Sequence, residues 1–549
     1  MFLKINKLLI ILLLIGAFLR FYKLDWGQGL FTHPDEYHIV ASVNQLVFPS
    51  QMNPHFFSYG TVTIYLIYFT QEIFKYFTTL FNQHSLLPNL FLVGRFYSAL
   101  FSTLTIFVVY KTCKLFMSGY FSYLTAFLVA ITPGLIQQAH FATPESALTF
   151  FLFASLYFIL KFIQKNKIIF LVTSSIFLGF AMGVKISSAV FLLPLTIAVI
   201  IRAWPKKLSF KKLSKLISYI LVILVVVIIF FAFAAPFVFI DLPAFLGNVQ
   251  YEGGLAIGKL PVFYTRQFID TVPVLFQFEK ILPYTLGPFL FLFSFFGFIF
   301  FIINAIKKRK PNQAIIIIAF LSTFLINAFL FAKWTRFIAP AFPFFAIFAT
   351  FLLEKFYLIN KSVSKILTTI LLVGTFLWTT AFFSIYFRPD IRITASDWIE
   401  KNFPENSTIL VEGGNMIDIP LKGNFQKTSL DFYSLEDSQT TRNKIANALH
   451  SSTYFLIQSR RVFYNHQRLS SLFPKTANFY NSLFDGKLGF AQINEFHSYP
   501  EVQIGSLRFE IPDEKAEETW SVFDHPVIRV FEKNKQLSIE QYEKILENK

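Results

Sequence analysis

Residues 214–236 read SKLISYILVILVVVIIFFAFAAP, and the apolar run within them is long enough to cross a lipid bilayer as one α-helix. The rest of the chain has a similar character, because 54% of its 549 residues are hydrophobic and only 15% are charged. In soluble proteins about one quarter of the residues are charged. The sequence therefore predicts a membrane protein that is mainly α-helical.

Further apolar runs recur through the first 387 residues, and we expect about eleven spanning helices in a polytopic membrane domain. With 214–236, the predicted spans are residues 8–19, 91–113, 118–139, 146–164, 168–184, 187–203, 285–306, 313–332, 337–354 and 365–387. The first run could belong to a signal peptide, but Arg20 to Lys23 follow it in place of a small-residue cleavage site. We therefore interpret it as an uncleaved first helix.

Basic residues cluster in alternate loops between these runs. Counted from a cytoplasmic N-terminus, the inside loops hold Lys4, Lys7, Lys111, Lys114, Lys161, Lys165, Lys167, Arg202, Lys206, Lys207, Lys211, Lys212, Lys215, Lys307, Lys308, Arg309, Lys310, Lys355, Lys361 and Lys365. By the positive-inside rule this pattern predicts a multi-pass protein of the plasma membrane with its N-terminus in the cytoplasm. We expect anionic membrane lipids to compensate the net charge of +17, and we expect no nucleic-acid partner.

One apolar stretch, Tyr59 to Phe81, does not fit this pattern. If it crossed the membrane, every later basic cluster would face outward, and it carries Gln71, Glu72 and Lys75 in its middle. We predict that it lies along the outer interface or re-enters there. The alternative is a twelfth spanning helix.

The composition changes at Arg388 to a mixed polar and charged sequence that continues to Lys549. Short apolar stretches between turn-forming residues predict a small α/β domain over residues 388–549, following a transmembrane domain over residues 1–387. An odd number of spans places this tail outside the cytoplasm. Because the chain has a single cysteine, no intrachain disulfide can form, and the tail must be stabilised by its core.

The first outer loop contains Thr32-His33-Pro34-Asp35-Glu36-Tyr37-His38. An adjacent Asp-Glu pair at the outer face can accept a proton from a hydroxyl or ligate a divalent metal ion. The alternative is an ordinary helix start, with Pro34 in the first turn and the acids near the positive end of the helix dipole. Both interpretations can hold together.

A second acidic loop reads Gln138-Ala139-His140-Phe141-Ala142-Thr143-Pro144-Glu145, and the predicted topology brings it to the same membrane face. It either completes a site with the first loop or simply begins the next helix.

Arg95, Lys185, Lys333 and Arg336 lie near the ends of predicted spans. Such charges are costly unless they are paired or snorkel to the headgroups, which makes them functional candidates. We expect snorkelling for Lys333 and phosphate binding for Arg336, because the guanidinium fork suits phosphate oxygens. The chain contains no phosphate-binding Gly-rich loop and no Gly-x-Ser-x-Gly elbow, which argues against ATP hydrolysis.

Several of these motifs, in this order, resemble the GT-C superfamily of polyprenyl-phosphate-dependent glycosyltransferases, near its protein O-mannosyltransferase and lipid A aminoarabinose-transferase branches. The motifs are His33-Pro34-Asp35-Glu36-Tyr37, Gly94-Arg95-Phe96-Tyr97-Ser98-Ala99-Leu100, His140 to Glu145, Gly179-Phe180-Ala181-Met182-Gly183-Val184-Lys185 and Arg336 to Pro343. In the tail, Thr394 to Ile399, Leu483 to Phe490 and Asp513 to Pro526 resemble prokaryotic members. The family also has juxtamembrane helices in the first outer loop.

The resemblance implies an enzyme that transfers a sugar, such as a mannose-like hexose, from a polyprenyl-phosphate donor to an acceptor hydroxyl at the outer membrane face, with inversion at the anomeric carbon. The acceptor would be a protein, a lipid or a glycan. Asp35 would act as general base or orient the acceptor, Glu36 would support it, and Glu145 would complete the catalytic group. Glu145 departs from the family pattern, in which this second acid is commonly Asp.

The resemblance further implies a substrate-binding set of His33, Tyr37, Arg95, His140, Lys185 and Arg336. Among these, Arg336 with Lys185 or Arg95 would bind the departing phosphate. No cofactor is required by the sequence, but some relatives use a divalent metal ion. Its candidate ligands here are Asp35, Glu36, His140 and Glu145.

Three other functions remain open from the sequence. A flippase or transporter for a lipid-linked saccharide would also need many spans, although no inverted repeat is found and the acids lie in loops. An oligosaccharyltransferase that uses a pyrophosphate carrier is the alternative within enzymes. A surface anchor for the tail would need only one span.

Overall fold

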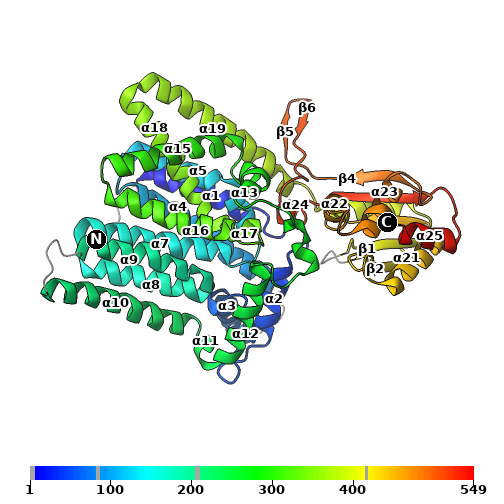
Figure 1. The fold of residues 1–549 in the computed structure, drawn as a ribbon, viewed down its shortest axis with the longest axis horizontal. Helices are drawn as coiled ribbons and strands as arrows, with labels where there is room; N and C mark the ends of the chain where they lie inside the picture. Colours follow the sequence, from blue (N-terminus) through cyan, green and yellow to red (C-terminus); the bar gives the residue numbers. More distant parts are fainter. Residues whose placement is uncertain (1–5, 82–86, 204–209, 414–417, 549) are drawn as a thin grey trace. The chain divides into compact units, whose positions relative to one another are not determined.

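The computed structural model describes residues 6–81, 87–203, 210–413 and 418–548. The chain divides into two compact units (Figure 1). The helical unit comprises Met1–Leu24, Asp35–Leu260 and Thr271–Thr380, and the tail unit comprises Asp25–Pro34, Pro261–Asp270 and Ala381–Lys549.

The helical unit is built almost entirely from helices, many of them aligned side by side. They are α1 (Lys7–Phe21), α2 (Pro34–Asn44), α3 (Thr61–Leu80), α4 (Leu90–Cys113), α5 (Gly119–Ile131), α6 (Pro133–Ala139), α7 (Glu145–Lys165), α8 (Ile168–Val184), η2 (Ile186–Phe191), α9 (Leu192–Ala203), α10 (Phe210–Ala234), α11 (Phe237–Ile240), α12 (Leu242–Ala256), α13 (Leu275–Lys280), α14 (Leu282–Thr285), α15 (Pro288–Lys307), α16 (Pro311–Ala328), α17 (Thr335–Ile338), η4 (Ala339–Ala341), α18 (Phe342–Ile359) and α19 (Lys361–Phe383).

Every apolar run predicted to span folds as helix, which confirms the polytopic helical membrane fold. Within the described residues, eight helical segments are long and apolar enough to cross a membrane by themselves. Three predicted spans fall short of this criterion: α1 has 15 residues, α8 has 17, and the pair α5 and α6 is bent by 53°. The bend lies at Thr132, which is extended because Pro133 disfavours the helical conformation in the residue before it.

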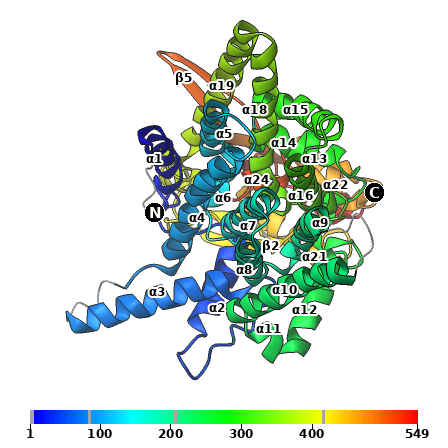
Figure 2. The same cartoon turned by 90° about the vertical axis from the view of Figure 1, so that its left-hand side faces the viewer.

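Helix α3 covers most of the stretch for which we predicted an interfacial position. Among the described residues, eight helical segments are long and apolar enough to span a membrane, and α3 is not one of them. Figure 2 shows α3 lengthwise, whereas α7 and α8 are seen nearly end-on, so α3 crosses their direction at a steep angle. Its first half buries Ile64 and Ile67, and its second half exposes Ile73, Phe74 and Phe77. The interfacial position stays a prediction, and this geometry favours it.

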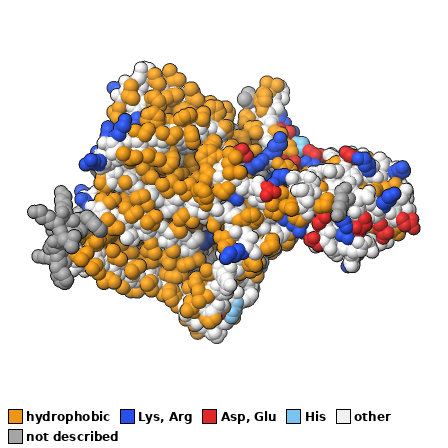
Figure 3. Space-filling view, viewed as in Figure 1, with side chains coloured by type: hydrophobic (Ala, Val, Ile, Leu, Met, Phe, Trp, Pro, Cys, Tyr) orange, Lys and Arg blue, Asp and Glu red, His pale blue; other side chains and the backbone are white. Residues whose placement is uncertain are grey.

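Close helix packing in the helical unit depends on a glycine. A Cβ atom at Gly297 in α15 would lie 2.1 Å from the carbonyl oxygen of Phe348 in α18, so only glycine permits this approach. The face of this unit that Figure 3 shows is mostly hydrophobic. A bundle with such a surface is suited to a lipid environment.

The tail unit contains a five-stranded mixed sheet in the order β2-β1-β3-β7-β4. Strands β1 and β2 and strands β1 and β3 pair in parallel, whereas β7 is antiparallel to both β3 and β4. Its elements are η3 (Phe263–Phe268), η5 (Ser384–Phe387), α20 (Ile391–Asn402), β1 (Thr408–Gly413), β2 (Gln426–Asp431), α21 (Gln439–Ser451), β3 (Tyr454–Ile457), α22 (Phe463–Arg468), α23 (Pro474–Phe484), β4 (Phe490–Phe496), β5 (Glu501–Ile504), β6 (Leu507–Glu510), α24 (Glu518–Ser521), β7 (Ile528–Lys533) and α25 (Ile539–Glu547). The predicted small α/β tail is therefore confirmed.

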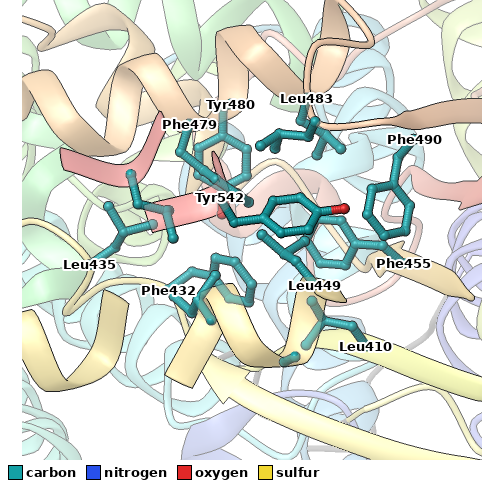
Figure 4. Packing of buried hydrophobic residues seen from close by; sticks show 14 of the residues in the cluster. Leu410, Phe432, Leu435, Leu449, Phe455, Phe479, Tyr480, Leu483, Phe490 and Tyr542 are labelled. Carbon is teal, nitrogen blue, oxygen red and sulfur yellow. The ribbon is translucent and has the colours of Figure 1, made fainter. Parts of the chain in front are cut away.

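Both faces of this sheet are covered. Leu410 and Phe455 point to one face and pack against Phe479 of α23 (Figure 4). Ile409 points to the other face and packs in a cluster with Ile399 of α20. Alternate residues of a strand point to opposite faces, so strands that are apolar at every position are buried on both sides.

The tail unit begins at Ala381, a few residues before the predicted boundary at residue 388, and it takes in two loops from earlier in the chain. The ring of Trp26 lies 6.0 Å from that of Tyr386, and Arg266 donates a hydrogen bond of 3.0 Å to the carbonyl oxygen of Tyr433. Such long-range contacts leave no compositional signal, so the sequence could not assign these loops.

Candidate functional site

The first acidic motif forms the start of α2. Pro34 takes the first helical position, where its missing N–H has no hydrogen-bond partner to lose, and Asp35 and Glu36 lie in the first turn. Residues next to each other in a helix point about 100° apart. The two carboxylates therefore project in different directions.

Glu36 forms a buried ion pair with Arg95 of α4, and both side chains are fully buried. Arg95 donates from Nε to Oε1 over 2.8 Å and from Nη2 to Oε2 over 3.0 Å. Its Nη1 donates to the carbonyl oxygen of Leu24, and the backbone N–H of Ala142 donates to Glu36 Oε1. Glu36 thus joins α2, α4 and the second acidic loop through fully satisfied polar contacts.

A glycine lets this junction form. A Cβ atom at Gly94 would lie 2.5 Å from the Cβ of Ala142, so a larger residue would push the second acidic loop away from α4. Arg95 follows directly, and Ala142 carries the N–H that reaches Glu36. This close contact explains why a glycine precedes Arg95 in the motif.

Asp35 forms a different pair. Its Oδ2 contacts the guanidinium of Arg336 and also accepts a 2.7 Å hydrogen bond from the hydroxyl of Tyr59. The Arg336 guanidinium lies 5.2 Å from the ring centroid of Trp334. The Asp35 and Arg336 side chains are 12% and 19% exposed, whereas the Glu36 and Arg95 side chains are fully buried.

Glu145 and Lys185 form a second pair, 3.4 Å apart, in which Lys185 is 15% exposed and Glu145 is buried. The Lys185 ammonium lies 5.4 Å from the ring centroid of Tyr59 and 4.9 Å from that of Phe337, the residue after Arg336. Tyr59 and Phe337 therefore connect the two ion pairs into one cluster. Glu145 Oε2 is buried and has no hydrogen-bond partner among the described residues.

Tyr59 is the member of this cluster that the sequence reasoning did not identify as functional. Burial raises the pKa of its hydroxyl well above the usual value, so the group remains protonated and donates to Asp35. Its only sequence signal is its place at the start of a stretch already predicted to lie at the interface.

Four other predicted residues lie outside the cluster. His140 is fully buried, with Nδ1 2.9 Å from the carbonyl oxygen of Ile136 and Nε2 3.1 Å from that of Tyr22. The ring of Tyr37 packs against that of Phe91. His33 belongs to the tail unit, where its ring lies 4.6 Å from that of Phe523. Lys333, for which we expected snorkelling, is buried and donates to Thr271 Oγ1 and to a carbonyl oxygen.

The four predicted metal ligands contact different partners in the structure. Within the residues that the structure describes, no three His, Cys, Asp or Glu side chains are arranged to hold a metal ion. Glu36 is occupied by Arg95, and His140 is held by backbone carbonyls, while Asp35 and Glu145 each face a cation. The ligand set of Asp35, Glu36, His140 and Glu145 therefore stays a prediction, and in this arrangement the four side chains contact different partners.

Residues 72–233 match the family model described as dolichyl-phosphate-mannose-protein mannosyltransferase. The matched segment contains Arg95, His140, Glu145 and Lys185. A comparison of the sequence with curated proteins finds no match.

Among solved structures, the chain is similar to the archaeal oligosaccharyltransferase AglB from Archaeoglobus fulgidus in complex with an inhibitory peptide and a dolichol-phosphate. The TM-score is 0.54 at 14% identity, over 86% of this chain and 72% of that chain. It is also similar to ArnT from Cupriavidus metallidurans in the apo state, with a TM-score of 0.46 at 14% identity, over 84% of this chain and 94% of that chain.

The likeness to AglB extends over most of both chains and establishes a common fold. The family match falls on the helices that carry the second acidic loop and Lys185. The resemblance to GT-C polyprenyl-phosphate glycosyltransferases, which are multi-pass membrane enzymes, is thereby confirmed: the chain shares a fold with AglB, and residues 72–233 match the mannosyltransferase family model.

Proposed function

We propose that this glycosyltransferase moves a sugar from a polyprenyl-phosphate carrier to an acceptor hydroxyl, with inversion at the anomeric carbon, at the outer face of the membrane. The observation that carries the proposal is the partly exposed cluster in which Asp35 with Arg336 and Glu145 with Lys185 meet across Tyr59. The name of the matched family supports a sugar phosphate of a long-chain polyprenol, such as a mannosyl donor.

Arg336 and Lys185 are the groups that we assign to the donor phosphate. Both are partly exposed cations whose present partners are carboxylates, which a phosphate can replace. Breaking the bond between the sugar C1 and the phosphate oxygen leaves the bonding electrons on the polyprenyl phosphate. A guanidinium and an ammonium held in place beforehand stabilise that charge as it develops.

Asp35 is the group that we assign as general base. Once Arg336 binds phosphate, the Asp35 carboxylate can accept the proton of the acceptor hydroxyl as its oxygen forms the new bond to C1. The Tyr59 hydroxyl keeps the carboxylate oriented through its 2.7 Å hydrogen bond. The activated donor supplies the energy of the reaction, so no nucleotide is needed.

Glu145 is assigned to acceptor binding in this scheme. Its Oε1 pairs with Lys185, whereas its buried Oε2 has no partner among the described residues. A buried carboxylate oxygen without a partner costs free energy that a donor group on a substrate would recover. A sugar or acceptor hydroxyl is such a donor.

Glu36 and Arg95 are assigned as positioning residues. They are fully buried and satisfy each other, so neither is available to a substrate. We make the same assignment for His140, whose two ring nitrogens face backbone carbonyls. Tyr37 and His33 stay predictions as substrate contacts.

The first test is transfer from a radiolabelled polyprenyl-phosphate sugar by the purified protein in liposomes, with peptide, lipid and glycan acceptors present. Asp35→Asn keeps the size of the side chain and removes its charge, and we expect it to abolish transfer in a protein that still folds. Asp25→Asn, at an exposed residue of the same loop, is the matched control and should transfer normally.

Three results would contradict the proposal. Normal turnover by Asp35→Asn would remove Asp35 from the reaction. Label that crosses the bilayer still attached to its carrier, regardless of Asp35, would identify a flippase. Transfer only from a pyrophosphate-linked saccharide would identify an oligosaccharyltransferase.

A further inference from the structure

Strands β5 and β6 form a two-stranded hairpin that stands apart from the five-stranded sheet of the tail unit (Figure 1). The strands are joined by the two-residue turn Gly505-Ser506, in which Gly505 has φ +62°. An isolated two-stranded hairpin is at best marginally stable in water, so this one requires support from elsewhere.

The hairpin has one apolar and one charged face. Val502 is paired with Phe509, and Leu507 lies on the same face as Phe509 because alternate residues of a strand point the same way. Leu507 is 61% exposed and Phe509 55% exposed. A pair of large apolar side chains exposed next to each other indicates a surface that binds an apolar partner.

The opposite face is held by ion pairs. Arg508 contacts Glu501 across the strands and lies 2.6 Å from Glu510 on its own strand. His497, in the segment leading to the hairpin, lies 3.2 Å from Glu510. The charged face is thus paired within the tail unit, whereas Leu507 and Phe509 remain exposed.

The base of the hairpin is fixed to the end of the last candidate span. Helix α19 ends at Phe383, and Glu501 at the start of β5 donates its backbone N–H to Oγ of Ser384 over 3.2 Å. Glu501 also pairs with Arg388. Phe387, between these two anchoring residues, is 52% exposed. The base of the hairpin is therefore tied to residues at the end of the last candidate span, Lys361–Phe387, and directly after it.

We propose that the apolar face of the β5–β6 hairpin binds the lipid bilayer at its interface and anchors the tail unit to the membrane surface. Phe and Leu side chains bind at the boundary between headgroups and acyl chains when they lie on the apolar face of an interfacial segment. The open strand edges carry unpaired backbone groups that need water or headgroup partners, so the hairpin lies at the headgroup level and does not enter the hydrocarbon core. Its charged face remains in water.

The test uses spin labels on single cysteines in the full chain, with Cys113→Ala as background. Leu507→Cys and Phe509→Cys place the label on the apolar face, and Gln503→Cys places it on the opposite face of the same hairpin. The protein is reconstituted in vesicles of phosphatidylethanolamine and phosphatidylglycerol. Collision of each label with oxygen, which is enriched in lipid, is compared with collision with a water-soluble nickel chelate.

We expect oxygen collisions to dominate at positions 507 and 509 and nickel collisions to dominate at 503. Equal access of nickel to all three labels would show that the hairpin stands in water and would overturn the proposal. Dipolar broadening between labels at 509 of two chains, with both reagents excluded, would identify a second copy as the partner and would also overturn it.

Discussion

Asp35 and Glu36 are neighbours in the sequence but pair with different cations. Asp35 contacts Arg336 in a partly exposed cluster, whereas Glu36 is closed off with Arg95. The separation follows from helix geometry, because neighbouring side chains project about 100° apart. Two adjacent carboxylates therefore differ in exposure: Asp35 is partly exposed, whereas Glu36 is fully buried.

At Arg336, removal of the guanidinium should affect the donor more than the acceptor. Arg336→Ala is expected to lower kcat/KM by about 10²-fold, by analogy with loss of one stabilising donor in other active sites. The apparent KM for the polyprenyl-phosphate sugar should rise more than that for the acceptor. Arg309→Ala, in an exposed loop, is the control. Equal changes in the two KM values would count against phosphate binding.

At Glu36 and Arg95, the expected effect is on stability. Arg95→Leu leaves Glu36 as an unpaired buried charge, which costs about 3–5 kcal/mol of unfolding free energy. The double variant with Glu36→Leu should recover part of this loss, because no charge is then left unpaired. Thermal unfolding in detergent measures both. A stable Arg95→Leu protein that has lost only its donor affinity would instead support direct phosphate binding.

At the scale of elements, the crossing of α15 and α18 determines how closely the bundle packs. Gly297→Ala puts a Cβ against the Phe348 carbonyl oxygen, and we expect a loss of about 1–3 kcal/mol from the resulting strain. Gly247→Ala, in α12 where a Cβ meets no atom within 4 Å, should be neutral or slightly stabilising. Thermal unfolding that ranked the two variants in the opposite order would contradict the close approach.

At the scale of the whole molecule, a loop of the tail unit holds a segment from the start of the chain. The ring of Phe523 packs against His33, and its carbonyl oxygen accepts a hydrogen bond from Thr32. Next to it, His525 lies between Asp513 at 2.9 Å and Asp524 at 2.5 Å, all three buried. The stability of this cluster therefore bears on the residues that precede Asp35 in the sequence.

This cluster predicts a pH dependence of the tail unit. Burial alone lowers the pKa of His525, but Asp513 and Asp524 outweigh it and raise the pKa from 6.5 to about 10. The protonated form is favoured by folding, so its contribution to stability is complete below about pH 6.5 and is lost as the pH rises through about 10.

The measurement is the unfolding midpoint of the tail unit in the full chain between pH 6 and pH 11, for the native protein and for His525→Gln. We expect the gap between the two midpoints to be largest at low pH and to close toward high pH. A gap that does not change with pH would show that His525 is neutral in the folded protein.

The sequence by itself determined the membrane class, the helical runs and the presence of a small tail domain, because each depends on local composition. Length and hydropathy decide whether a segment can span a bilayer, and this information lies within about 20 residues. The sequence also identified Asp35, Glu145, Lys185 and Arg336 as candidate residues. The resemblance to a family then supplied the chemistry expected of them.

Only the tertiary structure decided which charge meets which. It paired Glu36 with Arg95, brought Tyr59 to Asp35, separated the four predicted metal ligands and assigned two early loops to the tail unit. These contacts join residues far apart in the chain, and they depend on where close packing at positions such as Gly94 lets helices and loops meet. Local composition does not predict contacts between distant residues, so the charge pairs could be identified only from the tertiary structure.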